Sequence, residues 1–598
     1  MRKVLLFLLV VGFGTGLVGI TIGEMRFSKF QENIFRLVAE ARSVGIQKEK
    51  WASIAESARK LPPIFPISGI RNALLEASEI VEELETLKNV LPRISDDSLQ
   101  VSDMNLLFEK LKVFQTKLKR IERNLDFIPD IFLSTSQEEE IQIEVRKIRL
   151  VRSVLDDVEK FQGVFQKFSK REESVLVILQ NQNEPRSTGG FGGSFLFIDF
   201  GKEKISWHFE DVYALDKFVP EKEQIAAPEF FHDLSKTISL RDANFWPDFP
   251  TSARAYIDFL ESLEKEKKVQ HIPKTILAIN LNFAKAMLHL TGPVSLRKWG
   301  ITTTEANIEL VLQFLVESKI AGRFNVKLPV LEFMKELFAP ETLKKITAES
   351  LAQFDWENFI AQKNILGYSE NSELERLFEK WSVDGALRQK SDADNFLYFD
   401  FISVGANKSE KFMWTKIWHD SEIQKDGTVK NSLEITRTHS LREGEMDELL
   451  ETNLWFPNVR DLLNEEIFWK LGKGQNRTMI RVFIPADAQL MQAKNPSGRV
   501  SEVLSDDKKF QILEVPLFVG PGETGKTEII YETKMGKGSF NWRPYFLQVV
   551  GTPGREKTSF LSTVSTEAGG TFRAETMNIG KPEDLMDNDF RSVIEFIQ

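Results

Sequence analysis

The stretch with the clearest chemical potential is the polar loop at residues 181–192. It holds two asparagines, a glutamate, Arg186 with a serine and a threonine, and then a glycine group formed by Gly189, Gly190, Gly192 and Gly193. Because glycine has no Cβ, backbone N–H groups at such a rim approach an anion closely, with Arg186 as the nearby positive charge. The loop predicts a phosphate-binding site, and a flexible hairpin with a bulge is the alternative.

Two apolar runs flank this loop and must position it. Residues 175–179 and 193–200 have the length and the β-branched or aromatic content of strands buried on both faces. Sequences typical of strands at 205–209 and 275–279 then alternate with sequences typical of helices at 251–264 and 282–290. This alternation is typical of an α/β layer fold, so we assign residues 173–392 to an α/β domain whose carboxyl-terminal part, 304–388, is helical.

The first residues predict a membrane anchor. Arg2 and Lys3 precede an uncharged segment, 4–23, of about the twenty residues that a helix needs to cross the hydrocarbon core. Residues 1–3 then form a cytoplasmic tail, and the bulk of the chain lies outside. A cleaved signal peptide is the alternative, although no small-residue cleavage pattern follows. The small-xxx-small spacing of Gly12 and Gly16 is compatible with a dimer through the anchor.

Composition excludes several classes of function. A chain of 598 residues is too long for one ordinary domain. Its formal net charge of −10 offers no basic footprint for nucleic acid. With no cysteine the chain has no disulfide, thiolate metal site or cysteine nucleophile. The six histidines lack HxH or HExxH spacing, so the sequence does not indicate a zinc site.

The segments on either side of the α/β domain have contrasting patterns. Residues 24–172 carry apolar side chains at spacings of three and four, and prolines divide them, which predicts a membrane-proximal bundle of helices. From about residue 393 to 598, short β-rich runs alternate with turns, which predicts an antiparallel β-sandwich. The whole chain is therefore expected to be a multidomain α+β protein.

One stretch in the carboxyl-terminal part matches a phosphate-loop pattern but does not predict a phosphate site. Residues 520–527, GPGETGKT, fit G-x-x-x-x-G-K-T. Phosphate binding by this pattern requires the lysine and threonine to lie at the start of a helix. Here the next residues are EIIYET, a sequence typical of a strand. We therefore interpret this stretch as a hairpin turn.

Four segments together resemble a known family. They are NQNEPRSTGGFGGS at 181–194, RDANFWPDFPTSA at 241–253, LTGPV at 290–294 and GANKSEKF at 405–412. They are similar to the domain-of-unknown-function 4012 family of bacterial envelope proteins. Membership implies a surface-anchored bacterial protein and, by itself, no activity.

A more distant resemblance implies a mechanism. The order of strand, arginine-containing loop, strand, helix, strand and glycine turn, followed by AGRFNVKLPVLEFMKELF at 321–338, is similar to the LytR-CpsA-Psr family. Members attach glycopolymers to the cell wall and hold a polyprenyl pyrophosphate with arginines and Mg²⁺. The resemblance implies phosphate contacts from Arg186 and from Arg323 with Lys327. On a helix, positions 323 and 327 share one face, so both cations would meet one pyrophosphate.

The sequence departs from that family in two places. It reads His-Phe-Glu-Asp at 208–211 where the family has Arg-Asp, and Lys327 stands in for an arginine. Asp211 and Asp242 are the candidate Mg²⁺ ligands, and Arg241 is a further phosphate candidate. Arg241 and Asp242 can instead pair with each other or cap the following helix.

Two functions follow from these observations. The first is a membrane-anchored envelope protein that binds, or transfers, a polyprenyl-phosphate-linked cell-wall glycan through an anion pocket in the α/β domain. The second is a noncatalytic surface adhesion or scaffold protein that binds a partner through its β-sandwich. The sequence leaves open whether the protein is an enzyme.

Overall fold

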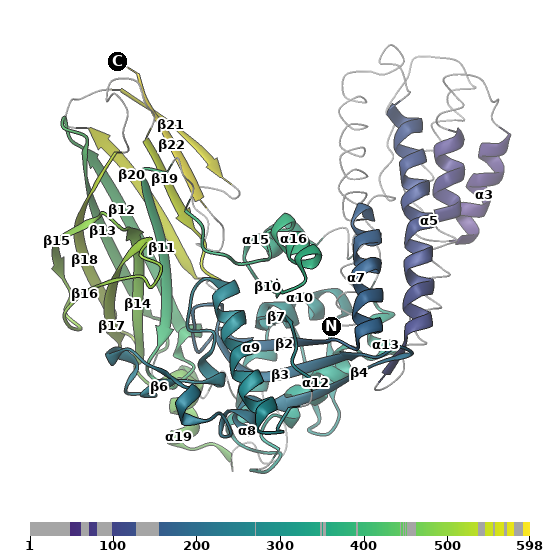
Figure 1. The fold of residues 1–598 in the computed structure, drawn as a ribbon, viewed down its shortest axis with the longest axis horizontal. Coiled ribbons are helices and arrows are strands. Elements are labelled where there is room, and N and C mark those ends of the chain that lie inside the picture. Colours follow the sequence, from purple (N-terminus) through teal and green to yellow (C-terminus); the bar gives the residue numbers. More distant parts are fainter. Residues whose placement is uncertain are drawn as a thin grey trace.

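The protein combines three parts, a helical segment, a central α/β domain and two packed sheets, as Figure 1 shows. A computed structural model describes the chain at 48–60, 71–80, 98–126, 155–269, 271–323, 325–346, 350, 354–389, 393–442, 444–446, 448, 450, 462–535, 545–553, 557–566, 571–578 and 590–597. The anchor expected at 4–23 lies outside these residues. Within them, no helix has the length and apolar character to span a bilayer.

The helical segment buries the apolar stripe that its spacing predicted. It includes α3 (Lys48–Arg59), a helix at 71–80, α5 (Val101–Asp126) and α7 (Val158–Arg171). Leu111 and Phe114 of α5 are fully buried in a core that also contains residues of the α/β domain. Just before α5, β1 (Ser98–Gln100) pairs with β4 of the central sheet, which ties this segment to the next part.

A six-stranded sheet in the order β1-β4-β3-β2-β7-β10 forms the middle of the α/β domain. Alternate residues of β2 face opposite cores, with Val177 on the side of α10 and α11 and Ile178 on the side of α9. The sheet is mixed, because β2 and β7 run parallel and their other pairs are antiparallel. The strands are β2 (Ser174–Asn181), β3 (Phe191–Phe200), β4 (Lys204–Asp211), β7 (Thr275–Ile279) and β10 (Ile365–Ser369).

Helices and short strands complete this domain. β10 corrects the expectation that 304–388 is wholly helical, since it pairs with β7 as an edge strand. The other elements are α8 (Val212–Asp216), η3 (Glu221–Glu223), β5 (Ile225–Ala226), η4 (Glu229–Phe231), β6 (Thr237–Ile238), η5 (Leu240–Asp242), α9 (Phe249–Lys265), α10 (Leu281–Thr291), β8 (Val294–Leu296), β9 (Ile301–Thr303), α11 (Ile308–Glu317), α12 (Leu328–Leu337), α13 (Pro340–Leu343), α15 (Trp356–Ala361) and α16 (Ser372–Lys380).

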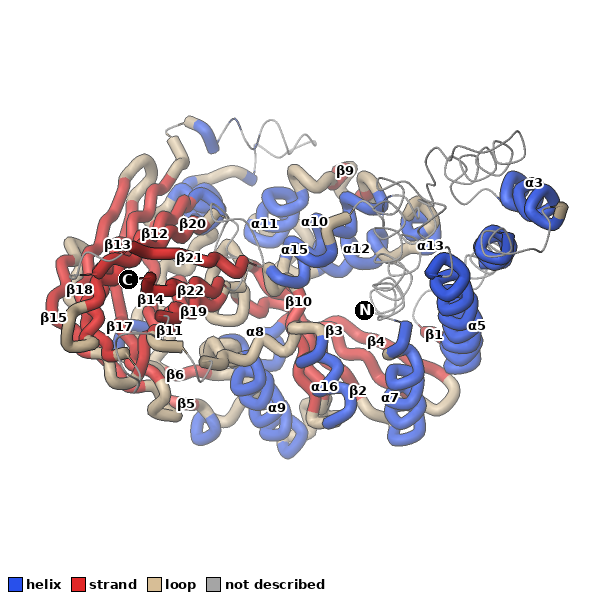
Figure 2. The backbone as a smooth tube through the Cα atoms, turned by 90° about the horizontal axis from the view of Figure 1, so that it is seen from above, coloured by secondary structure: helices blue, strands red, loops and turns tan. Residues whose placement is uncertain are grey.

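The carboxyl-terminal part is a sandwich of two sheets with one apolar core between them, seen from above in Figure 2. One sheet has the order β16-β17-β14-β11-β19-β22-β21 and the other β15-β18-β13-β12-β20. The strands are β11 (Asn395–Ser403), β12 (Met413–Ile423), β13 (Thr428–His439), β14 (Asn476–Pro485), β15 (Gln489–Lys494), β16 (Ser501–Leu504), β17 (Phe510–Val519), β18 (Thr524–Lys534), β19 (Tyr545–Val550), β20 (Thr558–Thr566), β21 (Thr571–Asn578) and β22 (Phe590–Ile597). Short helices are η6 (Ser409–Phe412), α19 (Glu465–Phe468) and η7 (Trp469–Lys473).

Two expectations about the sandwich are corrected. It is not purely antiparallel, because β11 pairs with β19 and β12 with β20 in parallel register. The phosphate-loop match at 520–527 is a turn followed by the start of β18, as its strand-like sequence indicated. That turn is not a hairpin, however, since β17 and β18 belong to different sheets.

Candidate functional site

The polar loop between β2 and β3 lies buried at the joint between the α/β domain and the sandwich. Its backbone folds back on itself, with the Phe191 N–H donating to the Glu184 carbonyl at 2.8 Å. From β11, the Ser403 N–H donates to the Pro185 carbonyl at 3.0 Å. The loop therefore forms part of the surface on which the sandwich docks.

The loop glycines pack against protein. Gly189 and Gly190 are buried and have φ angles of 117° and 137°, a region that L side chains rarely adopt. A Cβ on Gly190 would lie 2.2 Å from the Asn181 carbonyl oxygen, and one on Gly189 would lie 2.9 Å from Oε1 of Gln180. In the structure these glycines allow the loop backbone to lie against Gln180 and Asn181 of the same chain. The sequence had predicted instead that their N–H groups would face a bound phosphate.

Arg186 is buried at the same joint. Only 3% of its side chain is exposed, and its Nε donates to Oδ1 of Asp242 at 3.1 Å. Its Nη1 donates to the carbonyl of Ser403 at 3.3 Å, and its guanidinium lies 5.5 Å from the rings of both Phe191 and Phe231. A phosphate would have to displace Asp242 to reach this guanidinium, so the predicted role of Arg186 does not fit its position.

Asp242 joins two arginines. Its Oδ2 accepts a hydrogen bond from Nε of Arg241 at 3.2 Å, while its other oxygen binds Arg186. Arg241 also pairs with Asp216 at 3.4 Å, and its backbone N–H donates to the same carboxylate. Burial disfavours the Arg241 cation, but Asp242 and Asp216 outweigh that effect and raise its pKa. The pairing of Arg241 with Asp242, the simpler interpretation of the sequence, is present.

A second ion pair lies at the joint and comes from the sandwich. Asp400 of β11 and Arg481 of β14 are partners in register, and Nε of Arg481 donates to Oδ2 of Asp400 at 2.8 Å. Nη2 of Arg481 also donates to the Phe245 carbonyl at 2.7 Å and to the Ser187 hydroxyl at 3.0 Å. Since Asp400 is fully buried, this pair is desolvated, and removing either partner would leave an uncompensated buried charge at the contact between the two parts.

The Lys327 amino group lies beside the far end of the glycine group. It would be 3.0 Å from a Cβ on Gly193. In the described part of the chain it makes no hydrogen bond or ion pair, although Asp211 and Glu317 attract it electrostatically. Burial lowers the pKa of Lys327, Lys408 adds to the lowering, and the carboxylates oppose it.

Acidic residues near Lys327 are held by other lysines. Glu317 at the end of α11 pairs with Lys408 at 2.6 Å and with Lys470 at 3.8 Å. Lys408 also lies 3.8 Å from Oε2 of Glu184 in the loop. Burial disfavours the Glu317 carboxylate, but the charge and hydrogen bond of Lys408, together with the charges of Lys327 and Lys470, outweigh this effect and lower the Glu317 pKa. The network links the loop, α11 and the segment around η6 and η7.

The expected helical pairing of Arg323 with Lys327 is wrong. The helix α12 begins at Leu328, with Lys327 as its N-cap residue, so neither cation lies on a helical face. Arg323 is exposed in the turn before it. The structure therefore brings Arg186, Arg241 and Asp242 together and places Lys327 against the glycine group, while Arg323 stays at the surface.

The two candidate Mg²⁺ ligands do not form a cation site. Asp211 caps α8, where its side chain accepts the Tyr213 N–H at 3.0 Å, and Asp242 is occupied by two arginines. Across the described residues, no group of three or more histidine, aspartate or glutamate side chains is arranged to hold a metal. The donor set around these aspartates thus does not fit Mg²⁺.

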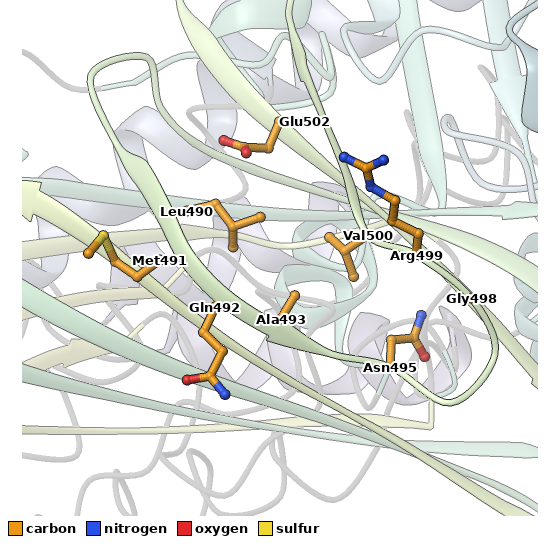
Figure 3. Close-up of a pocket in the computed structure, with 9 residues that line it drawn as sticks. All are labelled: Leu490, Met491, Gln492, Ala493, Asn495, Gly498, Arg499, Val500 and Glu502. Atoms are coloured by element: carbon orange, nitrogen blue, oxygen red, sulfur yellow. The ribbon is translucent and has the colours of Figure 1, made fainter.

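A pocket of about 520 Å³ lies at the edge of the sandwich, where β15 and β16 meet (Figure 3). It contains none of the residues singled out from the sequence. The turn between the two strands supplies Asn495, Gly498 and Arg499, and Glu502 of β16 adds a carboxylate. The remaining lining residues are Leu490, Met491, Gln492, Ala493 and Val500.

Sequence reasoning missed Asp400, Arg481 and Ser187. A signal for the first two was present, because each charge interrupts an apolar strand, in NFLYFDFIS and in NRTMIRVFIP. Opposite charges in two buried strands indicate a buried pair, since an isolated charge would be costly there. Ser187 carried no comparable signal.

Comparison with known proteins bears on the α/β domain. Residues 170–315 match the family model described as "Protein of unknown function (DUF4012)". This segment belongs to that family. The DUF4012 segment runs from the end of α7 to α11, so it contains the glycine loop and Arg241 but not the sandwich. No curated protein matches the chain.

Among solved structures, the chain is similar to a mutant M1 zinc metallopeptidase from Deinococcus radiodurans. The identity is 9%, and the match covers 31% of this chain and 39% of that one, with a TM-score of 0.15. So weak a likeness carries no argument about the DUF4012 segment or the rest of the chain.

Proposed function

We propose that the chain is a noncatalytic adhesion or scaffold protein of the bacterial envelope, which presents its β-sandwich to a partner. The observation that carries the proposal is the position of Arg186, buried 3.1 Å from Asp242 in the joint. Groups suited to catalysis would have to meet a substrate, whereas these hold two parts of one molecule together.

The contact between the α/β domain and the sandwich supports this function because buried ion pairs and hydrogen bonds hold it together. The Arg186–Asp242 and Arg481–Asp400 pairs are both buried, and Ser187 hydrogen-bonds to Asp400 at 3.0 Å between them. Removing one partner of such a pair strands a buried charge, so the contact resists partial opening. A connector of this kind suits a protein that holds a binding module at a set position.

The envelope location rests on the amino-terminal sequence and on the family. Residues 4–23 have the length and composition of a membrane anchor, with Arg2 and Lys3 before them. The DUF4012 resemblance implies a surface-anchored bacterial protein. In the proposal the anchor holds the chain in the membrane, and the sandwich lies on the outer side.

A second function is favoured by one observation. Lys327 is half-buried beside Gly193 and lacks a direct carboxylate partner within the described residues. An anion could neutralise it there, which is the arrangement that a polyprenyl-phosphate-linked glycan would use in a LytR-CpsA-Psr-like domain. The pairing of Glu317 with Lys408 leaves Lys327 available for that contact.

A thermal-shift experiment separates these functions. The full-length chain in detergent is melted with and without saturating polyprenyl pyrophosphate and Mg²⁺, because a ligand that binds only the folded state raises the melting midpoint. The scaffold proposal expects no shift. A shift that Lys327→Met abolishes and Arg323→Met preserves would overturn it and support the lipid-linked glycan.

A further inference from the structure

Two tryptophans stand out on the face of the five-stranded sheet that is turned away from the sandwich core. Trp414 and Trp418 of β12 are 51% and 53% exposed, and Leu561 of the neighbouring β20 is 46% exposed. Tryptophan side chains are rarely this exposed, because burying their large apolar surface is favourable. Exposed aromatic side chains that share a face commonly mark a binding surface.

The strand geometry holds both indoles on that face. Successive side chains of a strand alternate between faces, and Thr415, Ile417 and His419 of β12 are buried in the sandwich. Trp414 and Trp418 must then point outward together. They lie four residues apart, which corresponds to about 14 Å along a strand.

The surroundings of the tryptophans are polar. Thr438 is the β13 partner of Trp414, and Glu434 is the partner of Trp418. Lys416 lies on the same face between the two indoles, and the hydroxyls of Thr438 and Thr524 are 2.9 Å apart. The apolar surface therefore consists of separate rings set among hydrogen-bonding groups.

The charges on this face are of both signs. Lys526 pairs with Glu434 at 2.8 Å and with Glu528 at 2.9 Å, and Thr563 donates to Asp420. The face thus has no single-sign field that would select a strongly charged polymer. It does offer hydroxyl, carboxylate and ammonium groups beside flat aromatic surfaces.

We propose that this face, which we call the tryptophan platform (Trp414, Lys416, Trp418, Glu434, Thr438 and Leu561), binds an uncharged glycan chain. The C–H groups on one side of a pyranose ring carry partial positive charge and pack on the negative face of an indole, while its hydroxyls bind polar side chains. The two indoles are farther apart than one sugar ring is wide, so the ligand is an oligosaccharide or longer. This inference rests on the proposed function, for which it names the partner.

A glycan fits this face better than a protein does. The centre of a protein–protein interface is a continuous apolar patch depleted of charged residues. Here Lys416 separates the two indoles, and the ion pair of Lys526 with Glu434 lies alongside.

The opposite side of the sandwich is already occupied. Arg481 and Asp400 of the seven-stranded sheet contact the α/β domain through Phe245 and Ser187. In Figure 2, β12 and β13 lie on the other side of β11 from β6. The tryptophan platform lies on the sheet face turned away from that contact.

Co-sedimentation tests the proposal. The full-length chain in detergent is mixed with insoluble uncharged polysaccharides, namely chitin and cellulose, and the bound fraction is measured. The double variant Trp414→Ala/Trp418→Ala should bind about tenfold more weakly to the polysaccharide that retains the wild type. Trp469→Ala is the matched control, since Trp469 is 42% exposed but lies on η7 outside the platform, and it should bind as the wild type does.

Three outcomes would overturn the inference. They are no binding to any of these polysaccharides, equal binding by the double variant, and an oligomer that only the double variant loses, which would make the platform a contact between copies. An unchanged melting midpoint of the double variant shows that the loss is local. If no glycan binds and polyprenyl pyrophosphate causes no thermal shift, the scaffold function stands and its partner is another kind of molecule. A lipid-induced thermal shift would instead overturn the scaffold function itself, so the two failures are distinguishable.

Discussion

At the scale of single residues, His419 shows how burial sets a charge state. It is fully buried between the sheets, with Nδ1 3.0 Å from the Ser562 hydroxyl and Nε2 3.3 Å from the Tyr531 hydroxyl. The neutral ring satisfies both hydroxyls without bringing charge into the core. Burial lowers the pKa of His419 to about 4.

This pKa predicts an acid sensitivity. An unfolded histidine has a pKa of about 6.5, so the unfolded state binds the proton more tightly. The stability due to neutral His419 is complete above that pH and is lost as the pH falls toward 4. At pH 5 the loss is about 2 kcal/mol, and His419→Gln should remove it. Urea denaturation at pH 7 and pH 5 measures the difference.

His208 and His439 also have shifted pKa values, but both residues are present in the wild type and in His419→Gln, so the difference between the two proteins reports on His419. The Glu309 and Glu317 carboxylates have lowered pKa values, so their contribution is present above the pKa of an unfolded glutamate, about 4.3, and is lost only at lower pH. If wild type and His419→Gln lost the same stability between pH 7 and pH 5, the buried-histidine argument would be wrong.

At the scale of elements, the turn from β2 to β3 depends on backbone that only glycine adopts easily. Gly190 has a φ of 137° and no room for a Cβ. Gly190→Ala should therefore destabilise the protein by about 2 kcal/mol or more, from backbone strain and a clash with Asn181. Chemical denaturation of the two proteins gives the value.

Gly163 provides a matched comparison. It lies inside α7, and a Cβ there would meet nothing within 4 Å. Gly163→Ala should stabilise the protein by about 0.5–1 kcal/mol, because alanine loses less backbone freedom in a helix. Equal effects of the two substitutions would show that the conformation at Gly190 is not required.

Periodicity predicted elements but not their partners. The apolar runs of β2, β3 and β7 were placed within a few residues, since alternation and turn residues are local properties. The strand β10 was missed because five residues between helices give a weak signal. Parallel pairing of β11 with β19 depends on residues far apart in the chain.

The candidate site was harder to predict for the same reason. Arg186 was singled out as a phosphate contact, but the sequence does not reveal that Asp242 and Ser403 surround it. Whether a cation faces solvent or a carboxylate depends on tertiary packing. The charges of Asp400 and Arg481 inside apolar strands were the more informative signal, because a buried charge requires a partner.

At the scale of the whole molecule, the buried Asp400–Arg481 pair should govern the coupling of the two parts. Asp400→Ala leaves the Arg481 guanidinium buried without its carboxylate and should cost about 3–5 kcal/mol. In calorimetry, we expect the sandwich and the α/β domain of this variant to melt in separate transitions.

An exposed ion pair serves as the control. Lys526 pairs with Glu434 on the sheet surface, so Lys526→Ala should leave stability nearly unchanged and the transitions together. If Asp400→Ala behaved in the same way as Lys526→Ala, the joint would not depend on that pair.

The parallel register of β11 with β19 also has a consequence for biosynthesis. Asn395 of β11 lies opposite Leu547 of β19. During synthesis, one edge of β11 therefore stays unpaired until about 150 more residues have been made. A nascent or prematurely terminated chain exposes the aromatic edge of β11, which is a template for aggregation. Quality control by chaperones would therefore act on this protein until its last strands have left the ribosome.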